Sequence, residues 1–365
     1  LFALESAPRQ RELVLLVAEL DLGMGRVEAA LGLIAESMPL LSASTVGAKA
    51  LIERGDLESA RELLGQAASD EHYPPLASLL HLARAQYEDD GIERRLILDT
   101  AVASSPALAC ARWARLEARA HSGDASGAMA DAQHLEAAAS GRQARFTICN
   151  RAAERMLSAG LEQNAATLYQ RALRYAPDDV GAMLGLANSL HARGESLRAI
   201  PLLERAIQIG AESGQQSGAA CVTLAALVAT KLGDLPQAVS RVRAVPNGDP
   251  DVVTARGLEG RYRLMLGDIV GASLAFSRMR ELIAVEPQPS KWVEWLLEAA
   301  RFERDVLRDV NAAERHLSLA IRVAPRHSTA KELYREVAAV IAARRQRGEK
   351  QMQTPATSCD DPQGK

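Results

Sequence analysis

Aromatic residues are scarce in this chain. They make up 4% of its 365 residues, although hydrophobic residues together make up 48%. The apolar content is therefore mostly Ala, Leu, Val and Ile; Ala and Leu favour helices, and small side chains let helices pack closely. A compact β domain would need more aromatic and β-branched residues. The composition thus favours an all-α chain, and at this length it points to an elongated solenoid more than to two or three compact domains.

Cysteine is also rare, and the four cysteines, Cys110, Cys149, Cys221 and Cys359, lie far apart. No CxxC pair and no histidine at ligand spacing accompanies them, so no metal site is predicted. The first three lie in apolar helical stretches, where a free cysteine behaves as a small buried hydrophobe. Unpaired thiols suit a reducing compartment, and we therefore expect a cytoplasmic protein, with the periplasm as the alternative.

The chain has no excess of basic residues, and its formal net charge is −3. Binding of nucleic acid needs such an excess to displace counterions from phosphates, so no nucleic-acid partner is predicted. No run of 18 apolar residues occurs, so no direct insertion into a membrane is expected. The first residue is Leu1 rather than Met, from which we expect the chain to be one section of a longer protein.

Motifs for catalysis and cofactor binding are missing as well. The sequence contains no GxxxxGK phosphate loop, no HExxH, no GxSxG and no complete GxGxxG. His191 has Asn188 one helical turn away, but no serine or cysteine is evidently placed beside it as a nucleophile. We therefore predict no catalytic residue, no cofactor and no enzymatic activity.

What the chain does contain is a repeat. A short turn, often Gly-Asp, is followed by Ala five residues after the Gly at Gly25, Gly55, Gly123, Gly160, Gly194, Gly233 and Gly267, and Asp89 and Arg308 begin two weaker copies. The spacings between successive turns are 30, 34, 34, 37, 34, 39, 34 and 41 residues, so four of the eight equal 34. The turn glycine is expected to close one helix in a left-handed conformation, and the Ala to lie where the two helices of a unit cross.

Other positions keep the same register. Large apolar side chains four residues after the Ala position are predicted to fill the gap to the next unit: Leu64, Leu98, Tyr169, Leu203, Phe276 and Leu317. Four prolines are placed to end the second helix of their units: Pro106, Pro177, Pro250 and Pro325. In these positions residues from about 10 to 327 resemble the tetratricopeptide-repeat family, and we expect a bacterial member of it. The resemblance implies an all-α, right-handed α-solenoid of about nine helix-turn-helix units.

The repeat domain is expected to span residues 1–346 and to end in a capping helix over residues 328–345. Residues 347–365 lack apolar periodicity and are predicted to form a disordered polar tail. Arg94 replaces the small residue of the third unit, which predicts a splayed helix pair or an arginine that reaches solvent. The Gly-, Ser- and Pro-rich segments 210–218 and 286–291 predict longer loops.

In this family the first helix of each unit lines the concave face of the solenoid. By register, the polar candidates for partner binding are Asn150, Glu154, Asn188, His191, Thr223 and Arg261. Trp295, Glu298 and Phe302 hold equivalent places near the C-terminal end, where Trp295 and Phe302 have the alternative of packing against the capping helix. Grooves with a mixed polar and apolar lining recognise peptides or helices, and the alternative for the polar set is a solvated surface.

One known binding mode of the family does not fit this sequence. Some tetratricopeptide domains hold the C-terminal carboxylate of a chaperone with Lys, Arg and Asn residues spread over three units. The corresponding positions here are Leu184, Asn188, Leu224, Thr254 and Leu258, of which only Asn188 agrees. A carboxylate clamp in this register is therefore not expected.

The sequence as a whole predicts a protein–protein interaction scaffold. It is expected to bind a partner peptide or helix in the concave groove, as part of a larger protein or assembly. The alternative is a periplasmic spacer or assembly protein of an envelope machine such as polysaccharide export. The sequence leaves the identity of the partner and the oligomeric state open, because fold does not fix function.

Overall fold

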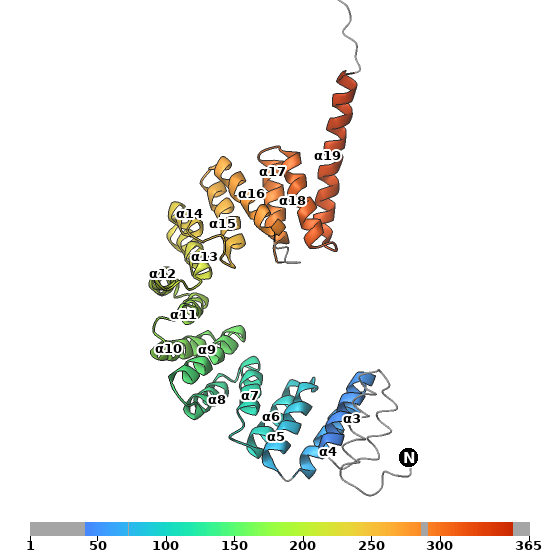
Figure 1. Cartoon of the computed structure of the whole chain (residues 1–365), viewed down its shortest axis with the longest axis vertical. Coiled ribbons are helices and arrows are strands. Elements are labelled where there is room, and N and C mark those ends of the chain that lie inside the picture. Colours follow the sequence, from blue (N-terminus) through green and yellow to red (C-terminus); the bar gives the residue numbers. More distant parts are fainter. Residues whose placement is uncertain (1–40, 72, 286–290, 353–365) are drawn as a thin grey trace, which may run out of the picture. The chain divides into compact units, whose positions relative to one another are not determined.

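The computed structural model describes residues 41–71, 73–285 and 291–352, and every regular element in these ranges is helical (Figure 1). The helices alternate as the first and second helices of successive pairs. The first helices are α3 (Leu41–Arg54), α5 (Pro74–Gln86), α7 (Ala109–His121), α9 (Arg142–Ser158), α11 (Val180–Ala192), α13 (Gly218–Leu227) with a π-helical turn η1 (Val228–Leu232), α15 (Val252–Met265) and α17 (Val293–Asp305). The second helices are α4 (Leu57–Asp70), α6 (Gly91–Ser104), α8 (Ala125–Ala138), α10 (Glu162–Tyr175), α12 (Ser196–Ser213), α14 (Leu235–Arg243), α16 (Ile269–Val285) and α18 (Val310–Val323), and α19 (Ser328–Met352) follows them. The prediction of an all-α array of helix-turn-helix repeats is confirmed, while the predicted unit around Gly25 lies outside the described residues.

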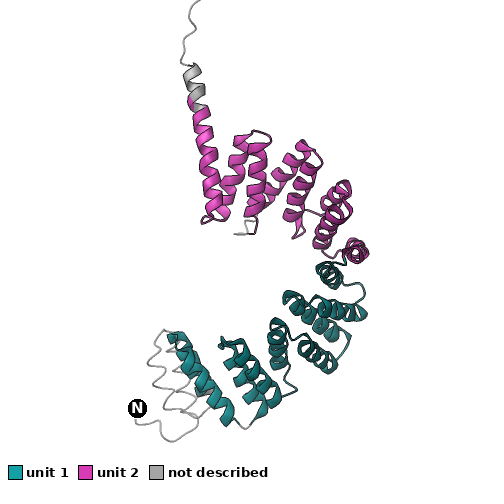
Figure 2. Cartoon of the chain, turned by 180° about the vertical axis from the view of Figure 1, so that it is seen from behind, with its two compact units in different colours: residues 1–195 teal, residues 196–365 magenta. Residues whose placement is uncertain are grey.

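The chain divides into two compact units, which we call unit 1 (residues 1–195) and unit 2 (residues 196–365) (Figure 2). Unit 1 contains α3 to α11, and unit 2 contains α12 to α19. Within each unit a helix packs mainly on its neighbours in the sequence, for example α9 on α10 and α15 on α16. Such local packing is how repeat proteins build a core from units that cannot bury an apolar face alone. The single domain predicted for residues 1–346 spans both units and stays a prediction.

The turns between the two helices of a pair have the predicted backbone. The glycines that close the first helices have positive φ: Gly55, Gly123, Gly160, Gly194, Gly233 and Gly267. Arg308 takes this conformation without being glycine, with φ 58°. The next residue is often an aspartate that caps the second helix; Asp124, for example, accepts a hydrogen bond from the backbone N–H of Gly127 at 2.9 Å. A left-handed residue and a capping aspartate side by side thus end one helix and start the next.

The residues predicted at the helix crossings are in the core. The small ones are fully buried, with 0% exposure: Ala60, Ala128, Ala165, Ala199, Ala238, Ala272 and Ala313. The large ones of the same register are at most 3% exposed: Leu64, Leu98, Tyr169, Leu203, Phe276 and Leu317. An alanine at a crossing lets two helices approach, and the large side chain one turn later fills the space beside it. This repeated pattern is what the 34-residue period encodes.

Three expectations about local structure need correction, while the one about Arg94 is not contradicted. The segment 210–218 is not one long loop, because α12 continues to Ser213 and only residues 214–217 separate it from α13. The last helix does not end at residue 345 but continues to Met352. Arg94 is half-buried, and its guanidinium donates a hydrogen bond to the carbonyl oxygen of Glu88. Cys110 is exposed, whereas Cys149 and Cys221 are buried as predicted. The predicted loop 286–291 falls almost wholly outside the described residues.

Candidate partner-binding surfaces

Two of the predicted site residues meet on α9 in unit 1. The side-chain amide of Asn150 donates a hydrogen bond to the Glu154 carboxylate at 2.8 Å. Both line a shallow surface pocket on α9, together with Arg151 and Arg155. The amide oxygen of Asn150 is buried and has no hydrogen-bond partner. Buried polar atoms are nearly always hydrogen-bonded, so this oxygen is an exceptional, unsatisfied acceptor.

The same face of α9 is joined to α7 by an aromatic contact. The guanidinium carbon of Arg151 lies 5.0 Å from the centre of the Trp113 ring. One turn along, Arg155 forms an ion pair with Glu117 of α7 at 3.2 Å. Trp113 and Glu117 are both half-buried. Two successive first helices therefore share a Trp–Arg stack and an Arg–Glu pair on a surface that solvent reaches.

Unit 2 has a related group between α15 and α17, in which the tryptophan is on the later helix and one arginine makes both contacts. The guanidinium of Arg261 lies 4.5 Å from the centre of the Trp295 ring. It also donates two hydrogen bonds to the Glu298 carboxylate, the one from Nε at 2.8 Å. The hydrogen bond with Glu298 raises the pKa of Arg261 above its ordinary value. The side chains of Arg261 and Glu298 remain 45% and 32% exposed, so the group is fixed in place and still accessible.

Trp295 owes its position to a glycine. Gly257, one turn before Arg261, is buried beneath the indole, and a Cβ there would come within 2.6 Å of Trp295 Cε3. Phe302 packs on Phe276 of α16, with ring centres 5.5 Å apart. Trp295 thus contacts α15 and Phe302 contacts α16, while their packing on the last helix stays a prediction.

The remaining predicted residues lie on first helices as expected. Asn188 is half-buried and His191 is exposed, both on α11 in unit 1. Thr223 is half-buried on α13 in unit 2. The six residues thus belong to two units, and the close contact among them is that of Asn150 with Glu154.

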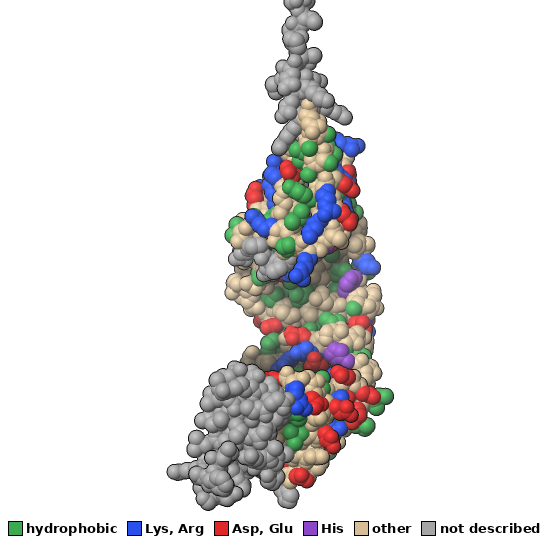
Figure 3. Space-filling model, turned by 90° about the vertical axis from the view of Figure 1, so that its right-hand side faces the viewer, with side chains coloured by type: hydrophobic (Ala, Val, Ile, Leu, Met, Phe, Trp, Pro, Cys, Tyr) green, Lys and Arg blue, Asp and Glu red, His purple; other side chains and the backbone are tan. Residues whose placement is uncertain are grey.

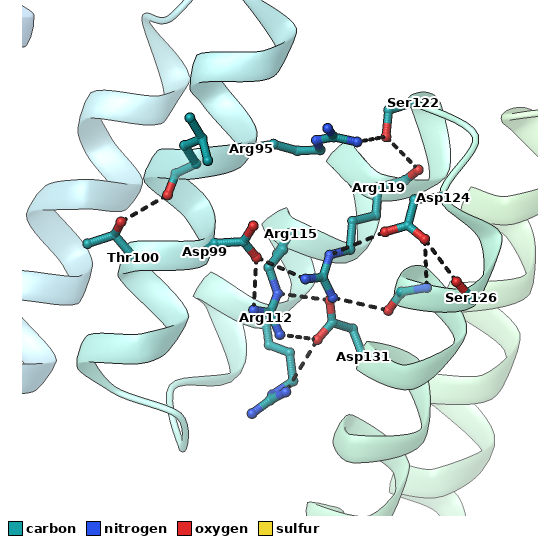
Figure 4. Close-up of polar contacts among 12 residues, drawn as sticks. Arg95, Asp99, Thr100, Arg112, Arg115, Arg119, Ser122, Asp124, Ser126 and Asp131 are labelled. Atoms are coloured by element: carbon teal, nitrogen blue, oxygen red, sulfur yellow. Dashed lines mark hydrogen bonds and ion pairs between the residues drawn. The ribbon is translucent and has the colours of Figure 1, made fainter.

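A buried ionic cluster in unit 1 was not predicted from the sequence. Asp131 of α8 is 1% exposed, and three arginines of α7 surround its carboxylate (Figure 4). Arg115 donates to it at 3.0 and 2.6 Å, Arg119 at 3.0 Å and Arg112 at 3.3 Å. Arg115 and Arg119 also reach Asp99 of α6, at 3.1 and 2.9 Å. Burial opposes the charge of Arg115, but the contacts with Asp131 and Asp99 outweigh it and raise its pKa. The cluster ties α6, α7 and α8 together.

Unit 2 buries the titratable side chains of His316 and Glu303, and His316 is unpaired. His316 of α18 is fully buried, and neither ring nitrogen has a hydrogen-bond partner. Burial, aided by the charges of Arg280 and Arg315, lowers the pKa of His316 to about 3. Glu303 of α17 is 2% exposed and accepts a hydrogen bond from Ser273 at 2.8 Å, and burial raises the pKa of its carboxyl. The imidazole is therefore neutral in the folded chain.

Unit 1 also presents an acidic cleft between α4, α5 and α6. Figure 3 shows acidic side chains gathered on one face of this unit. The cleft is lined by Glu58, Glu62, Asp70, Glu88 and Glu93, with Arg61 and Arg84 as its basic members. Arg61 pairs with Glu88 at 2.9 Å and Arg84 with Glu93 at 3.0 Å. The acidic residues outnumber the basic ones, so this face of unit 1 is negative.

Neither a metal cluster nor a membrane span emerges from the described residues. No three His, Cys, Asp or Glu side chains within residues 41–71, 73–285 and 291–352 are placed to hold a metal ion. None of the helices in this part of the chain is both long and apolar enough to cross a bilayer.

Comparison with known proteins gives similarity at the level of the fold. No family model matches the sequence, and no curated protein matches it. A tetratricopeptide repeat protein from Parabacteroides merdae is similar in structure, at 16% identity and a TM-score of 0.41, over 66% of this chain and 93% of that one. The thermophilic TPR protein TTC0263 of Thermus thermophilus is similar at 20% identity and a TM-score of 0.29, over 50% of this chain and 99% of that one. The human IFIT1 dimer with PPP-AAAA is similar at 16% identity and a TM-score of 0.44, over 92% of this chain and 85% of that one.

At these TM-scores the similarities carry no argument about the architecture of this chain or about what it binds. Its own helix pairs, turns and crossings nevertheless have the tetratricopeptide arrangement. The fold is therefore tetratricopeptide-like, and any functional conclusion has to come from the surfaces of this chain.

Proposed function

We propose that this chain is a protein-interaction scaffold that binds a peptide or helix of a partner protein against its first helices, as part of a larger protein or assembly. The observation that carries the proposal is the group of Arg261, Trp295 and Glu298, which joins two successive first helices in unit 2. Arg and Trp are the residue types that most often dominate the energy of protein interfaces. Here they are accessible and already held in one geometry, which lowers the entropy lost on binding.

Unit 1 supports the proposal with a second group of the same kind. Trp113 and Arg151 supply the stack, and the pocket beside them offers the Asn150 amide and the Glu154 carboxylate. The Glu154 carboxylate, oriented by the Asn150 amide, suits a donor such as a backbone N–H of a bound peptide. An aromatic surface next to amide and carboxylate groups matches a peptide with both apolar and polar side chains.

The other predicted residues belong to the same proposal. Asn188, His191 and Thr223 lie on first helices, and in a bound complex they supply polar contacts at the margin of each group. Residues at such margins usually contribute less energy than a central Arg or Trp. Their substitution should therefore weaken binding less than substitution of Arg261. No observation on the described residues favours the alternative of a periplasmic spacer.

The proposal can be tested without knowing the natural partner. A peptide-display selection on the purified full chain yields ligands, and their Kd values are then measured for wild type and variants. We expect Arg261→Ala to raise Kd by about 30-fold, corresponding to about 2 kcal/mol. The double variant Asn188→Ala/His191→Ala is expected to raise it less, and Arg151→Ala reports on the unit 1 group.

Arg322→Ala is the matched control, because Arg322 is an exposed arginine on the second helix α18. It should leave Kd unchanged. If every selected peptide binds Arg261→Ala and Arg151→Ala as tightly as wild type, the proposed surfaces are wrong. Circular dichroism of each variant shows whether the fold is retained.

A further inference from the structure

Unit 2 exposes a row of large apolar side chains at the turns between α15 and α16 and between α17 and α18. We call this row the apolar edge. Each member is between 38% and 81% exposed: Met265, Leu266, Ile269, Val270, Leu274, Val306 and Leu307. Single exposed apolar residues are ordinary on a soluble protein, but a concentration of seven around two turns is not. Exposed apolar patches of this kind mark sites where the protein binds another surface.

The two turns belong to one surface because their helices are packed together. The Ser273 hydroxyl, one turn into α16, donates to Glu303 near the end of α17 at 2.8 Å. The Phe276 and Phe302 rings of the same two helices lie 5.5 Å apart. Since successive helices of a repeat array alternate in direction, the turn after α15 and the turn after α17 lie at the same edge of the unit.

In unit 1 the α5–α6 turn exposes Ile92 and Leu96 at the places of Val270 and Leu274, but two other turns are polar. The turn after α7 is formed by Ser122, Gly123 and Asp124, and the turn after α3 is flanked by an ion pair between Arg54 and Asp56 at 3.0 Å. These residues suit contact with water. The apolar side chains of unit 2 are therefore not a requirement of the turn itself, which needs only a left-handed residue and a helix cap.

The charges around the apolar edge are balanced within the chain. Arg263 pairs with Asp268 at 2.8 Å, and Arg304 pairs with Asp305 at 2.7 Å. Arg308 adjoins Asp309, whose carboxylate caps α18 by accepting from the backbone N–H groups of Asn311 and Ala312. Three basic and three acidic residues thus alternate, with no net charge to attract a strongly charged partner or to repel a copy of the same surface.

We propose that the apolar edge is the contact surface of a symmetric dimer, in which it packs against the same edge of a second copy of this chain. A two-fold interface needs a surface that is complementary to itself, and most soluble homo-oligomers are built on such interfaces. An apolar centre with a charge-balanced rim meets that need, because no like charges are forced together on association. The dimer surface is centred on turns and adjoins the first-helix face of the proposed function at Met265, one helical turn from Arg261 on α15.

The test is the oligomeric state of the full chain with and without charges on the apolar edge. Sedimentation velocity of wild type up to about 100 µM is expected to show a dimer. The double variant Val270→Glu/Leu274→Glu should sediment as a folded monomer, with Kd for self-association raised at least tenfold. Both positions are well exposed, at 81% and 52%, so the substitutions do not enter the core.

A closely matched control exists in unit 1. Ile92 is the second residue of α6 as Val270 is of α16, Leu96 follows four residues later as Leu274 does, and both are exposed, at 67% and 62%. The variant Ile92→Glu/Leu96→Glu should remain as dimeric as wild type. A wild-type chain that is monomeric at about 100 µM overturns the proposal. So does a dimer that Val270→Glu/Leu274→Glu leaves intact, or one that the control variant dissociates equally well.

A mixing experiment separates a symmetric contact from one between two different surfaces. Tagged Val270→Glu/Leu274→Glu is mixed with untagged wild type, and the untagged chain retained on the tag is measured. In a symmetric dimer the variant edge faces the wild-type edge, so retention should fall at least tenfold relative to tagged wild type. Undiminished retention would show that the second copy is bound by another surface.

Discussion

Gly257 lies directly beneath the Trp295 ring, and the absence of a side chain there is what allows the indole to rest on α15. A Cβ at this position would come within 2.6 Å of Trp295 Cε3 and 2.7 Å of Cδ2. The same indole supports the Arg261 guanidinium on its face. A helical glycine with no φ requirement of its own thus sets the geometry of the candidate binding group in unit 2.

Replacing Gly257 by Ala should displace the Trp295 ring and separate it from Arg261. Overpacking in a core costs about 1–3 kcal/mol, and the better helix propensity of Ala returns about 1 kcal/mol, so we expect a net loss of about 1 kcal/mol in urea unfolding. Near-ultraviolet circular dichroism should report the moved indole. Gly91→Ala is the control, because no atom lies within 4 Å of the added Cβ. Equal stability gains in both variants would contradict the close packing.

Removing the carboxylate of Asp131 should be among the most damaging single changes in unit 1. Asp131→Ala leaves the arginines of α7 close together with only the partly exposed Asp99 and Asp124 to offset them. Breaking a buried ionic group by removing one partner costs about 3–5 kcal/mol. Asp99→Ala removes a carboxylate that is 46% exposed, where an ion pair contributes about 1 kcal/mol or less. Hydrogen exchange of α6 to α8 in the two variants measures the difference, and similar protection in both would show that the burial of Asp131 is unimportant.

The turn between α17 and α18 should be improved by glycine. Arg308 has φ 58°, a left-handed conformation that costs a residue with a side chain about 1–2 kcal/mol. Arg308→Gly relieves this cost and loses part of the gain to the greater freedom of glycine in the unfolded chain, so we expect a net stabilisation of about 0.5–1 kcal/mol. Gly267→Ala makes the opposite change at the preceding turn and should destabilise by a similar amount. Thermal unfolding checks both, and a lower Tm for Arg308→Gly would count against the strain.

The stability of unit 2 should fall in mild acid because of His316. The pKa of His316 in the folded chain is about 3, below the ordinary value of 6.5. Between these two pH values the unfolded chain binds a proton at His316 that the folded chain does not bind. The contribution of neutral His316 to the free energy of unfolding is complete above pH 6.5. As the pH falls from 6.5 towards 3, the free energy of unfolding decreases by up to about 1.4 kcal/mol per pH unit. His316→Leu keeps the volume and removes the titration. Urea unfolding at pH 7 and pH 5 should show a smaller decline for this variant than for wild type, and equal declines would assign the acid sensitivity elsewhere.

The repeated features of the fold were predictable from the sequence, because each follows from a short-range rule. Gly123 and Asp124 specify a turn and a cap whatever surrounds them, and Ala128 at a fixed distance specifies a close crossing. The end of α12 was not predictable in this way. The run after Gly210 reads as a loop by composition, but Gly210 is itself buried in the helix and the helix continues to Ser213.

The candidate site was predictable in its location but not in its contacts. Register placed Arg261 and Trp295 on first helices, but their stacking depends on how α15 and α17 approach, which Gly257 permits and no local rule states. The buried arginine cluster was missed for a similar reason. Arg112, Arg115 and Arg119 form a stripe at helical spacing, which by itself indicates a solvated face. Only the packing of α8 brings Asp131 against them.

The pairing of a left-handed glycine with a capping aspartate has a consequence for how such a chain can grow. Both residues are adjacent in the sequence, so the instructions for ending one helix and beginning the next occupy two neighbouring codons. A duplicated or transplanted stretch of gene carries its own turn and helix cap and needs no matching change elsewhere. Repeats can therefore be gained, lost or exchanged while their outward side chains diverge, which makes the number of units and the choice of ligand separate targets of selection.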